Sequence, residues 1–320
     1  MIIAALLLMQ TSYSPETEAV MNRSRKQAAE RRVEEGRAKA AQAQGPKDAN
    51  GDAASFAQAV KLPAAVAARL QACLDKATDD PVAGVKFAQD WALEGGGFPA
   101  AQCNGFAEAQ AENWDDAAKA FDAAATAAQK EGALHDAARL WTQAGNAMLA
   151  GGKPDKARDY FDAALGHGLP DGLAKGEVYL DRARTLVMLN DMAGARKDLD
   201  MALVQAKDDP LAWLLSATLA RRQDDFTRAR HDIEEAKKRA PDDASVALED
   251  GNIAIVSGDE KAARMAWEQV LKLSPDGDAS KFAKDALAQL DAQAQLGAQA
   301  KGAVQGGEAA AHSSSAPPSR

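Results

Sequence analysis

The sequence predicts an all-α protein built from stacked helical hairpins, that is, a helical solenoid. Hydrophobic residues make up 46% of the chain but aromatic residues only 5%. Alanine supplies much of the difference, and it favours helices packed at close range. No stretch between Ser55 and Leu290 keeps the period-two alternation that a half-buried strand requires. The third observation is an internal repeat of about 34 residues, a length typical of solenoids.

The repeat consists of a small residue in a first helix and a second-helix pattern that begins twelve residues later. The small residues are Gly105, Gly145, Ala183, Ala217 and Gly251, at steps of 40, 38, 34 and 34 residues. The second-helix patterns are Ala117/Phe121/Ala124, Ala157/Phe161/Ala164, Ala195/Leu199/Ala202, Ala229/Ile233/Ala236 and Ala263/Trp267/Val270. Unrelated amphipathic helices would not keep one register over five units. We therefore expect about five hairpins over residues 98–276.

Close helix packing explains the pattern. Two antiparallel helices approach closely only where small side chains meet, as Gly145 and Ala157 would allow. Phe161 and its counterparts are then expected to fill the space between one hairpin and the next. One hairpin cannot bury its apolar face alone, so neighbouring hairpins stack.

This motif resembles the tetratricopeptide repeat (TPR). From Trp141 to Pro170 the chain reads W-x2-A-G-x2-M, then A-x3-F-x2-A, then P, close to the TPR order W-x2-L-G-x2-Y, A-x3-F, P. It departs from that order where Ala144 and Ser216 replace the usual Leu, and where Met148 replaces the usual Tyr. The resemblance covers residues 98–276 and implies an array that holds a peptide or a partner protein in a concave groove. The function that it predicts is a non-catalytic protein–protein interaction scaffold.

The resemblance also implies which side chains line the groove, because the first helix of each TPR hairpin faces the concave side. The candidate partner-binding residues are Thr142, Asn146, Asp181, Arg184, Thr218, Arg221 and Asn252. Asn146 and Asn252 can each donate to and accept from a ligand's main chain. Thr142 stands where a carboxylate-clamping TPR would need Lys, which disfavours the C-terminal tails of chaperones as ligands. The alternative is that these residues are only solvated.

The sequence carries no pattern that predicts catalysis, a metal site or a cofactor. It has no G-x-S-x-G motif, and its four histidines are not spaced to share a metal. An enzyme that uses the array as a scaffold is the alternative from another class, and it lacks a recognisable catalytic domain. Asp-Asp pairs at Asp79, Asp115, Asp208, Asp224 and Asp242 stand near predicted helix starts, where aspartate caps exposed N–H groups.

Charge narrows the class of partner. The formal net charge is −9 and the pI about 5.1, whereas nucleic-acid binding needs a basic surface. A protein or peptide partner is therefore expected, and no nucleic acid. Residues 15–55 form a basic, Ala/Gln/Arg-rich segment that is predicted to be an exposed or partly helical linker. Membrane contact is expected only through this segment.

The N-terminal residues indicate the cellular compartment in which the protein is expected to work. Residues 1–14 form a candidate signal peptide. The unbroken apolar run from Ile2 to Met9 is too short to span a bilayer, but it has the length of a signal-peptide core. No Lys or Arg precedes that run, and Pro15 would block cleavage after Ser14. We expect export to the periplasm of a bacterium. The alternatives are an uncleaved anchor, or a cytoplasmic TPR adaptor that starts at Met21.

Two cysteines, Cys73 and Cys103, fall on separate predicted helices. In an oxidising compartment they can form a disulfide across the first hairpins. The alternative is two buried thiols, since free cysteine is among the most buried residue types.

The array is expected to have caps at both ends. Residues 56–97 are predicted to form a degenerate hairpin before the first repeat, because terminal repeats are atypical. Residues 277–298 are predicted to form a capping helix over the last hairpin. Residues 299–320, rich in Gly, Ala, Ser and Pro, are predicted to be disordered, since they offer little apolar surface to bury.

Overall fold

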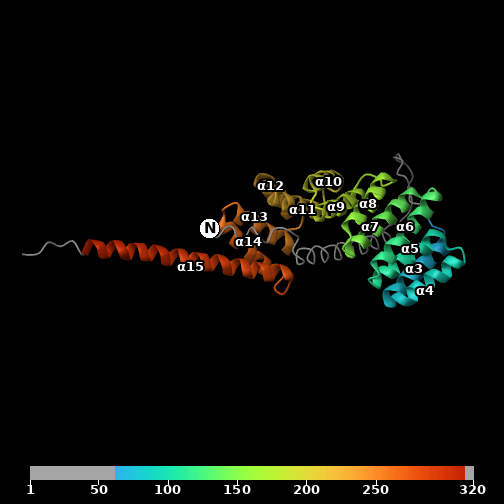
Figure 1. The fold of residues 1–320 in the computed structure, drawn as a ribbon, viewed down its shortest axis with the longest axis horizontal. Helices are drawn as coiled ribbons and strands as arrows, with labels where there is room; N and C mark the ends of the chain where they lie inside the picture. Colours follow the sequence, from blue (N-terminus) through green and yellow to red (C-terminus); the bar gives the residue numbers. More distant parts are fainter. Residues whose placement is uncertain (1–61, 314–320) are drawn as a thin grey trace, which may run out of the picture. The chain divides into compact units, whose positions relative to one another are not determined.

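The structure is a computed structural model that describes residues 62–313. This part of the chain contains thirteen α-helices and no strand (Figure 1). The predicted all-α class is therefore confirmed. The candidate signal peptide at 1–14 and the linker at 15–55 lie outside the described residues, so both stay predictions.

The helices follow one another as hairpin pairs joined by short turns. The first pair, α3 (Ala64–Asp79) and α4 (Pro81–Leu93), occupies the region predicted to be a degenerate hairpin. The first helices of the five repeats are named A helices here: α5 (Gly97–Gln110), α7 (Leu134–Ala150), α9 (Leu173–Met188), α11 (Pro210–Arg222) and α13 (Ala244–Val256). The second, or B, helices are α6 (Trp114–Lys130), α8 (Pro154–Gly166), α10 (Met192–Gln205), α12 (Phe226–Arg239) and α14 (Glu260–Leu273). A final helix, α15 (Asp278–Ser313), follows.

The chain divides into two compact units, with the boundary after Leu219 in α11. In the first unit α3 packs against α4 and α5, and from α4 to α10 each helix packs against the next. In the second unit α13 packs against α12 and α14, and α15 packs against α13 and α14. Each unit is thus a stack of successive hairpins, the arrangement that the 34-residue repeat predicts.

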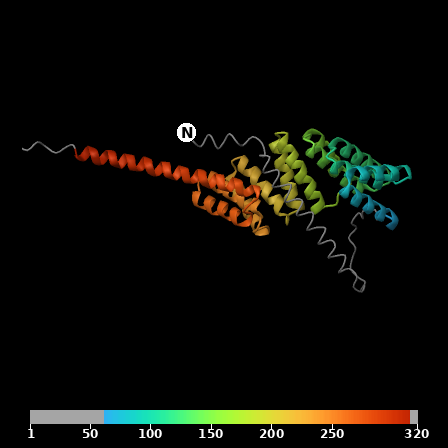
Figure 2. The same ribbon diagram turned by 90° about the horizontal axis from the view of Figure 1, so that it is seen from below.

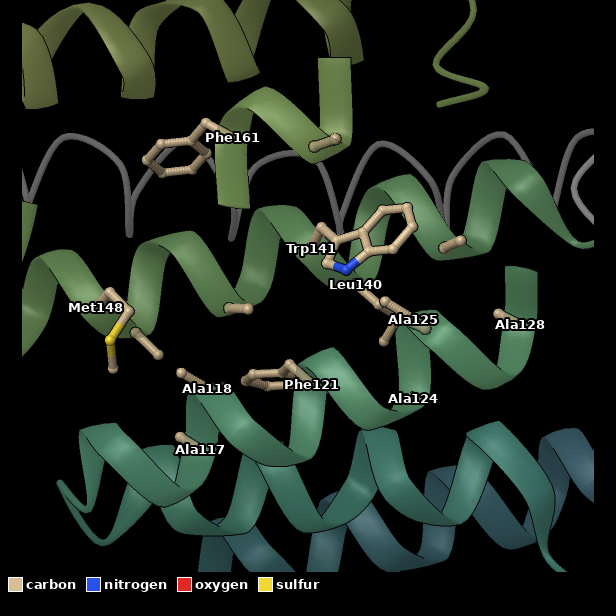
Figure 3. Packing of buried hydrophobic residues seen from close by; sticks show 14 of the residues in the cluster. Ala117, Ala118, Phe121, Ala124, Ala125, Ala128, Leu140, Trp141, Met148 and Phe161 are labelled. Atoms are coloured by element: carbon tan, nitrogen blue, oxygen red, sulfur yellow. The ribbon is translucent and has the colours of Figure 1, made fainter. Parts of the chain in front are cut away.

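In each hairpin that has a glycine at the small position, this glycine packs against an aromatic ring of the B helix. A methyl group at Gly145 would lie 2.7 Å from Cε1 of Phe161, and one at Gly105 would lie 2.7 Å from Cδ1 of Phe121. Both rings are buried in one core cluster (Figure 3). The ring of Phe161 thus packs on the glycine of its own hairpin, which refines the expectation that it fills the space between hairpins.

The size of the B-helix side chain follows the size of the A-helix residue. Glycine faces Phe121, Phe161 and Trp267 in three repeats. In the other two repeats alanine stands at the small position, and the aligned B-helix residues are Leu199 and Ile233, both buried. A methyl group on the A helix thus goes with a smaller side chain on the B helix, which keeps the packed volume nearly constant.

Polar contacts join each B helix to the helix that follows it. They run from Asp122 to Trp141 (3.0 Å), Asp162 to Arg182 (2.6 Å), Arg196 to Ser216 (2.7 Å), Lys237 to Asp250 (2.8 Å) and Arg264 to Asp291. Ser216 stands where Leu is usual in the motif, and its hydroxyl accepts a hydrogen bond from the guanidinium of Arg196. Arg182 also donates twice to the buried Asp198, at 2.7 Å each. These bonds raise the pKa of Arg182 above its ordinary value, so it stays charged while it ties α8, α9 and α10 together.

Aspartates cap several of the helices, as their positions in the sequence predict. Asp80, Asp225 and Asp243 are second members of Asp-Asp pairs, and each accepts from a backbone N–H of the helix that follows. Asp115 and its neighbour Asp116 lie instead inside the first turn of α6. A negative charge in the first turn interacts favourably with the helix dipole, but these side chains do not cap the helix.

Cys73 of α3 and Cys103 of α5 form a disulfide, with their Cα atoms 6.2 Å apart. Both residues are fully buried and pack with Ala88 of α4. The bond therefore joins the terminal hairpin to the first repeat across their shared core.

The C-terminal helix differs from the prediction. Ala279, Ser280, Ala283 and Leu290 of α15 are buried against the last hairpin, as a capping helix requires. The helix does not end at 298, however, but continues to Ser313, beyond the other helices of its unit in both views (Figures 1 and 2). The expected disordered tail from 299 is corrected accordingly, since Ala, Gln and Glu in this stretch favour helix despite its low apolar content. Residues 314–320 lie outside the described part.

The contact between Gly145 and Phe161 gives a direct test of the packing. Gly145→Ala should destabilise the protein by about 1–3 kcal/mol, because the new methyl group would overlap the ring. Adding Phe161→Leu should recover part of that loss, since the pair then has the residues found at Ala183 and Leu199. Urea unfolding of the single and double variants measures the coupling.

Gly166→Ala is the matched control, because no atom lies within 4 Å of a methyl group there. Its stability should be unchanged or higher. Additive effects of the changes at 145 and 161 would show that the ring and the glycine are not in contact.

Candidate protein-interaction site

The candidate site lies on the A helices, and the surface that they form within each unit is called the A-helix face below. Within the first unit, Arg139 of α7 donates to Gln102 of α5 across 3.2 Å, and α7 also packs against α9. Eight of the eleven buried polar residues in the described part lie on A helices: Gln102, Asp136, Asp181, Arg184, Thr185, Ser216, Thr218 and Glu249. The A helices therefore carry most of the buried hydrogen-bonding groups.

On α7 the two predicted groove residues, Thr142 and Asn146, are both half-buried. The hydroxyl of Thr142 donates to the carbonyl of Ala138 one turn earlier, at 2.9 Å. Among the described residues, the side chain of Asn146 has no hydrogen-bond partner. Its amide therefore keeps both its donors and its acceptor for a ligand.

On α9 the predicted groove residues are inside the protein. Asp181 and Arg184 are only 5% and 7% exposed, and they form an ion pair at 3.7 Å, one turn apart. This burial argues against the alternative that they are only solvated, and their role as ligand contacts stays a prediction. Replacing Arg184 with a carboxylate would bury two like charges side by side, so a charge reversal here is unsuitable as a test of binding.

On α11, Thr218 is also buried, and its hydroxyl donates to the carbonyl of Leu214 at 2.9 Å. All residues from Leu214 to Leu219 are buried. Thr218 therefore contributes to packing, and its role as a ligand contact stays a prediction.

In the second unit, the predicted residues Arg221 and Asn252 belong to one hydrogen-bonded chain. Arg221 donates through two nitrogens to Glu249, at 2.7 and 3.2 Å. Asn252 donates to the same carboxylate at 3.4 Å and accepts from the indole N–H of Trp267 at 3.3 Å. The amide of Asn252 is thus engaged on both sides, whereas Asn146 at the same repeat position is not.

Sequence reasoning missed Gln102, Asp136, Arg139 and Glu249, which complete these polar groups. A signal was available for Gln102, Asp136 and Glu249, because each lies on the A-helix stretch of its repeat at a place where an apolar residue would pack. The pairing itself could not be predicted, since it joins residues from different repeats.

Catalytic and metal-binding arrangements are a separate question. Among the described residues, no group of His, Cys, Asp and Glu is placed to hold a metal ion. His167 instead packs its ring against Trp141, with centroids 5.0 Å apart. In the same part of the chain, no helix is long and apolar enough to cross a membrane.

Comparison with known families agrees with this architecture. A model described as "Tetratricopeptide repeat" matches residues 107–172, 142–210 and 214–278, together more than half of the chain. The chain belongs to the tetratricopeptide repeat family. No curated protein shows a significant sequence match to it. As a TPR protein, it has a fold that serves as a scaffold for protein or peptide partners.

Solved structures show the same fold at low identity. PilW, a type IV pilus biogenesis factor, matches with a TM-score of 0.56 at 17% identity, over 69% of this chain and 99% of PilW. PilF of Pseudomonas aeruginosa matches with a TM-score of 0.55 at 15% identity, over 69% and 97% of the two chains. Yeast Tom70 matches with a TM-score of 0.52 at 20% identity, over 70% of this chain and 47% of Tom70.

The two equivalent asparagines should respond differently to truncation. Asn252→Ala should destabilise the protein by about 1–2 kcal/mol, because the buried indole N–H of Trp267 loses its acceptor. Asn146→Ala should change stability by less than about 0.5 kcal/mol, since no bond is lost. Thermal and urea unfolding of the two variants measure this, and equal losses would contradict the assigned hydrogen bonds.

Proposed function

We propose that this protein is a non-catalytic scaffold that binds a peptide or a partner protein on the A-helix face of its TPR array. The observation that carries the proposal is the concentration of buried polar residues on the A helices. Asn146 is the clearest single contact point, because it is half-buried and its amide is unused within the described residues. A group of this kind adds hydrogen bonds to a ligand without first breaking internal ones.

We further propose that the protein works in the bacterial cell envelope. Two features support this location. Residues Ile2 to Met9 form an unbroken apolar run, and the disulfide between Cys73 and Cys103 is of a kind that persists in oxidising compartments. The second candidate is a cytoplasmic TPR adaptor that starts at Met21, in which both cysteines would be thiols.

The binding surface can be tested by site-specific photocrosslinking in cells. A photoreactive side chain at Asn146 should give a discrete crosslinked partner, because this position lies on the A-helix face. The same group at Lys119, an exposed residue of the B helix α6, is the control and should give none. Crosslinking at 119 but not at 146 would move the interaction to the B-helix side and contradict the proposal.

The location can be tested by the intact mass of the native protein from fractionated cells, with and without reductant. Removal of residues at or just beyond the predicted signal segment 1–14, in an envelope fraction, is the expected result. The mass should rise by about 2 Da on reduction under denaturing conditions, as the bond between Cys73 and Cys103 opens. A chain that begins at Met1 or Met21 in the cytosol, with no mass change on reduction, would favour the adaptor.

A further inference from the structure

The terminal hairpin, formed by α3 and α4, buries far fewer residues than the repeats that follow it. Of the sixteen residues of α3 only Cys73 and Ala77 are buried. The helix α4 buries three residues, Gly84, Ala88 and Trp91. In contrast, α6 buries seven residues and α7 buries nine. The terminal hairpin therefore gains less from burial than these later helices do.

The side chains at the contact between this hairpin and α5 are small. A methyl group at Gly84 would lie 2.5 Å from Cβ of Ala77 and 3.1 Å from Cβ of Ala107 in α5. Trp91 is the one large side chain among the buried residues of α3 and α4. It lies beneath Arg69 of the same hairpin, with the guanidinium carbon 5.2 Å from the ring centroid. Because small side chains make few dispersion contacts, the packing against α5 holds the hairpin only weakly.

The polar contact that joins each later B helix to the next helix has no equivalent between α4 and α5. Among the described residues, no side-chain hydrogen bond or ion pair links α3 or α4 to α5. An ion pair between Arg69 and Glu94, at 2.6 Å, stays within the hairpin and is exposed, so it adds little stability. The link across this contact is instead the disulfide between Cys73 and Cys103.

The disulfide is enclosed once the hairpin is in place. Both cysteines are fully buried, and Ala88 of α4 packs with them. Thiol–disulfide exchange requires a thiolate to reach a sulfur atom, so exchange is blocked while the hairpin is docked on α5. The bond therefore forms before docking is complete, and the docked hairpin then protects it.

We propose that the terminal hairpin docks on the array only in the oxidised protein, so that the disulfide controls whether this hairpin is ordered. The bond forms by exchange with a disulfide oxidant. The thiolate of one cysteine attacks the oxidant, and the thiolate of the other attacks the mixed disulfide. The oxidant leaves as a dithiol, with the two electrons and two protons that the cysteines lose.

The two redox states then differ in the surface of the first repeat. In a reducing compartment, where the disulfide does not form, the hairpin stays undocked and the side of α5 that carries Cys103 and Ala107 is uncovered. In an oxidising compartment the hairpin covers it. This switch is independent of the partner that the A-helix face binds.

Hydrogen–deuterium exchange of the purified protein, measured by mass spectrometry, tests the proposal. The oxidised protein is compared with protein refolded from urea in the presence of a reductant, which has the same side chains. An intact mass about 2 Da higher confirms that the bond is open. In the reduced protein, peptides from α3 and α4 should exchange at least about tenfold faster, because the hairpin has lost its link to α5. Peptides from α6 to α8 should change by less than about twofold.

The variant that combines Cys73→Ala and Cys103→Ala is the control for the reductant. Its α3 and α4 peptides should exchange at least as fast as those of the reduced protein, whether or not reductant is present. Slow exchange in α3 and α4 after complete reduction would overturn the proposal, since packing alone would then dock the hairpin. Faster exchange that extends to α6, α7 and α8 would overturn it too, because the bond would then stabilise the array as a whole.

Discussion

The close approach of two helices at a residue without a side chain is the contact on which the array depends. At Gly145 the helices of one hairpin come together so tightly that the ring of Phe161 occupies the place of a side chain. Because an aromatic ring is wide and flat, it fills the narrow space between the two helices of the hairpin. Where the small residue is Ala183, the partner Leu199 is smaller, so the chain varies the two positions together.

Polar contacts between side chains are the second kind of interaction that organises the array, and they join one hairpin to the next. Arg182 connects three helices through Asp162 and Asp198, and Arg196 replaces an apolar contact with a bond to Ser216. Such contacts are directional, so they fix the angle between repeats more tightly than alanine packing would. Eight of the eleven buried polar residues in the described part of the chain lie on the A helices.

The repeat, the hairpins and most of the helix caps could be predicted because each depends on residues a fixed distance apart in the sequence. Asp181 and Arg184 show where this reasoning stops. Their spacing places them on the A-helix face, but spacing carries no information about burial, and neighbouring helices enclose them. Glu249 was missed because its partner Arg221 lies 28 residues away, in another repeat. The helix from 299 to 313 was missed because apolar content predicts packing, whereas alanine-rich helices also form by backbone propensity.

The bond between Cys73 and Cys103 has a consequence for how the array comes apart. In a solenoid each repeat is held mainly by its neighbours, so end repeats tend to fray first and one at a time. Here α3 is tethered to α5 through a 30-residue separation, so the terminal hairpin cannot leave without disturbing the first repeat. The two ends are therefore unequal. Within the described chain, the disulfide makes the N-terminal end resist stepwise unfolding. The disulfide does not constrain the opposite end, where α15 covers the last hairpin, so that end is free to unfold first.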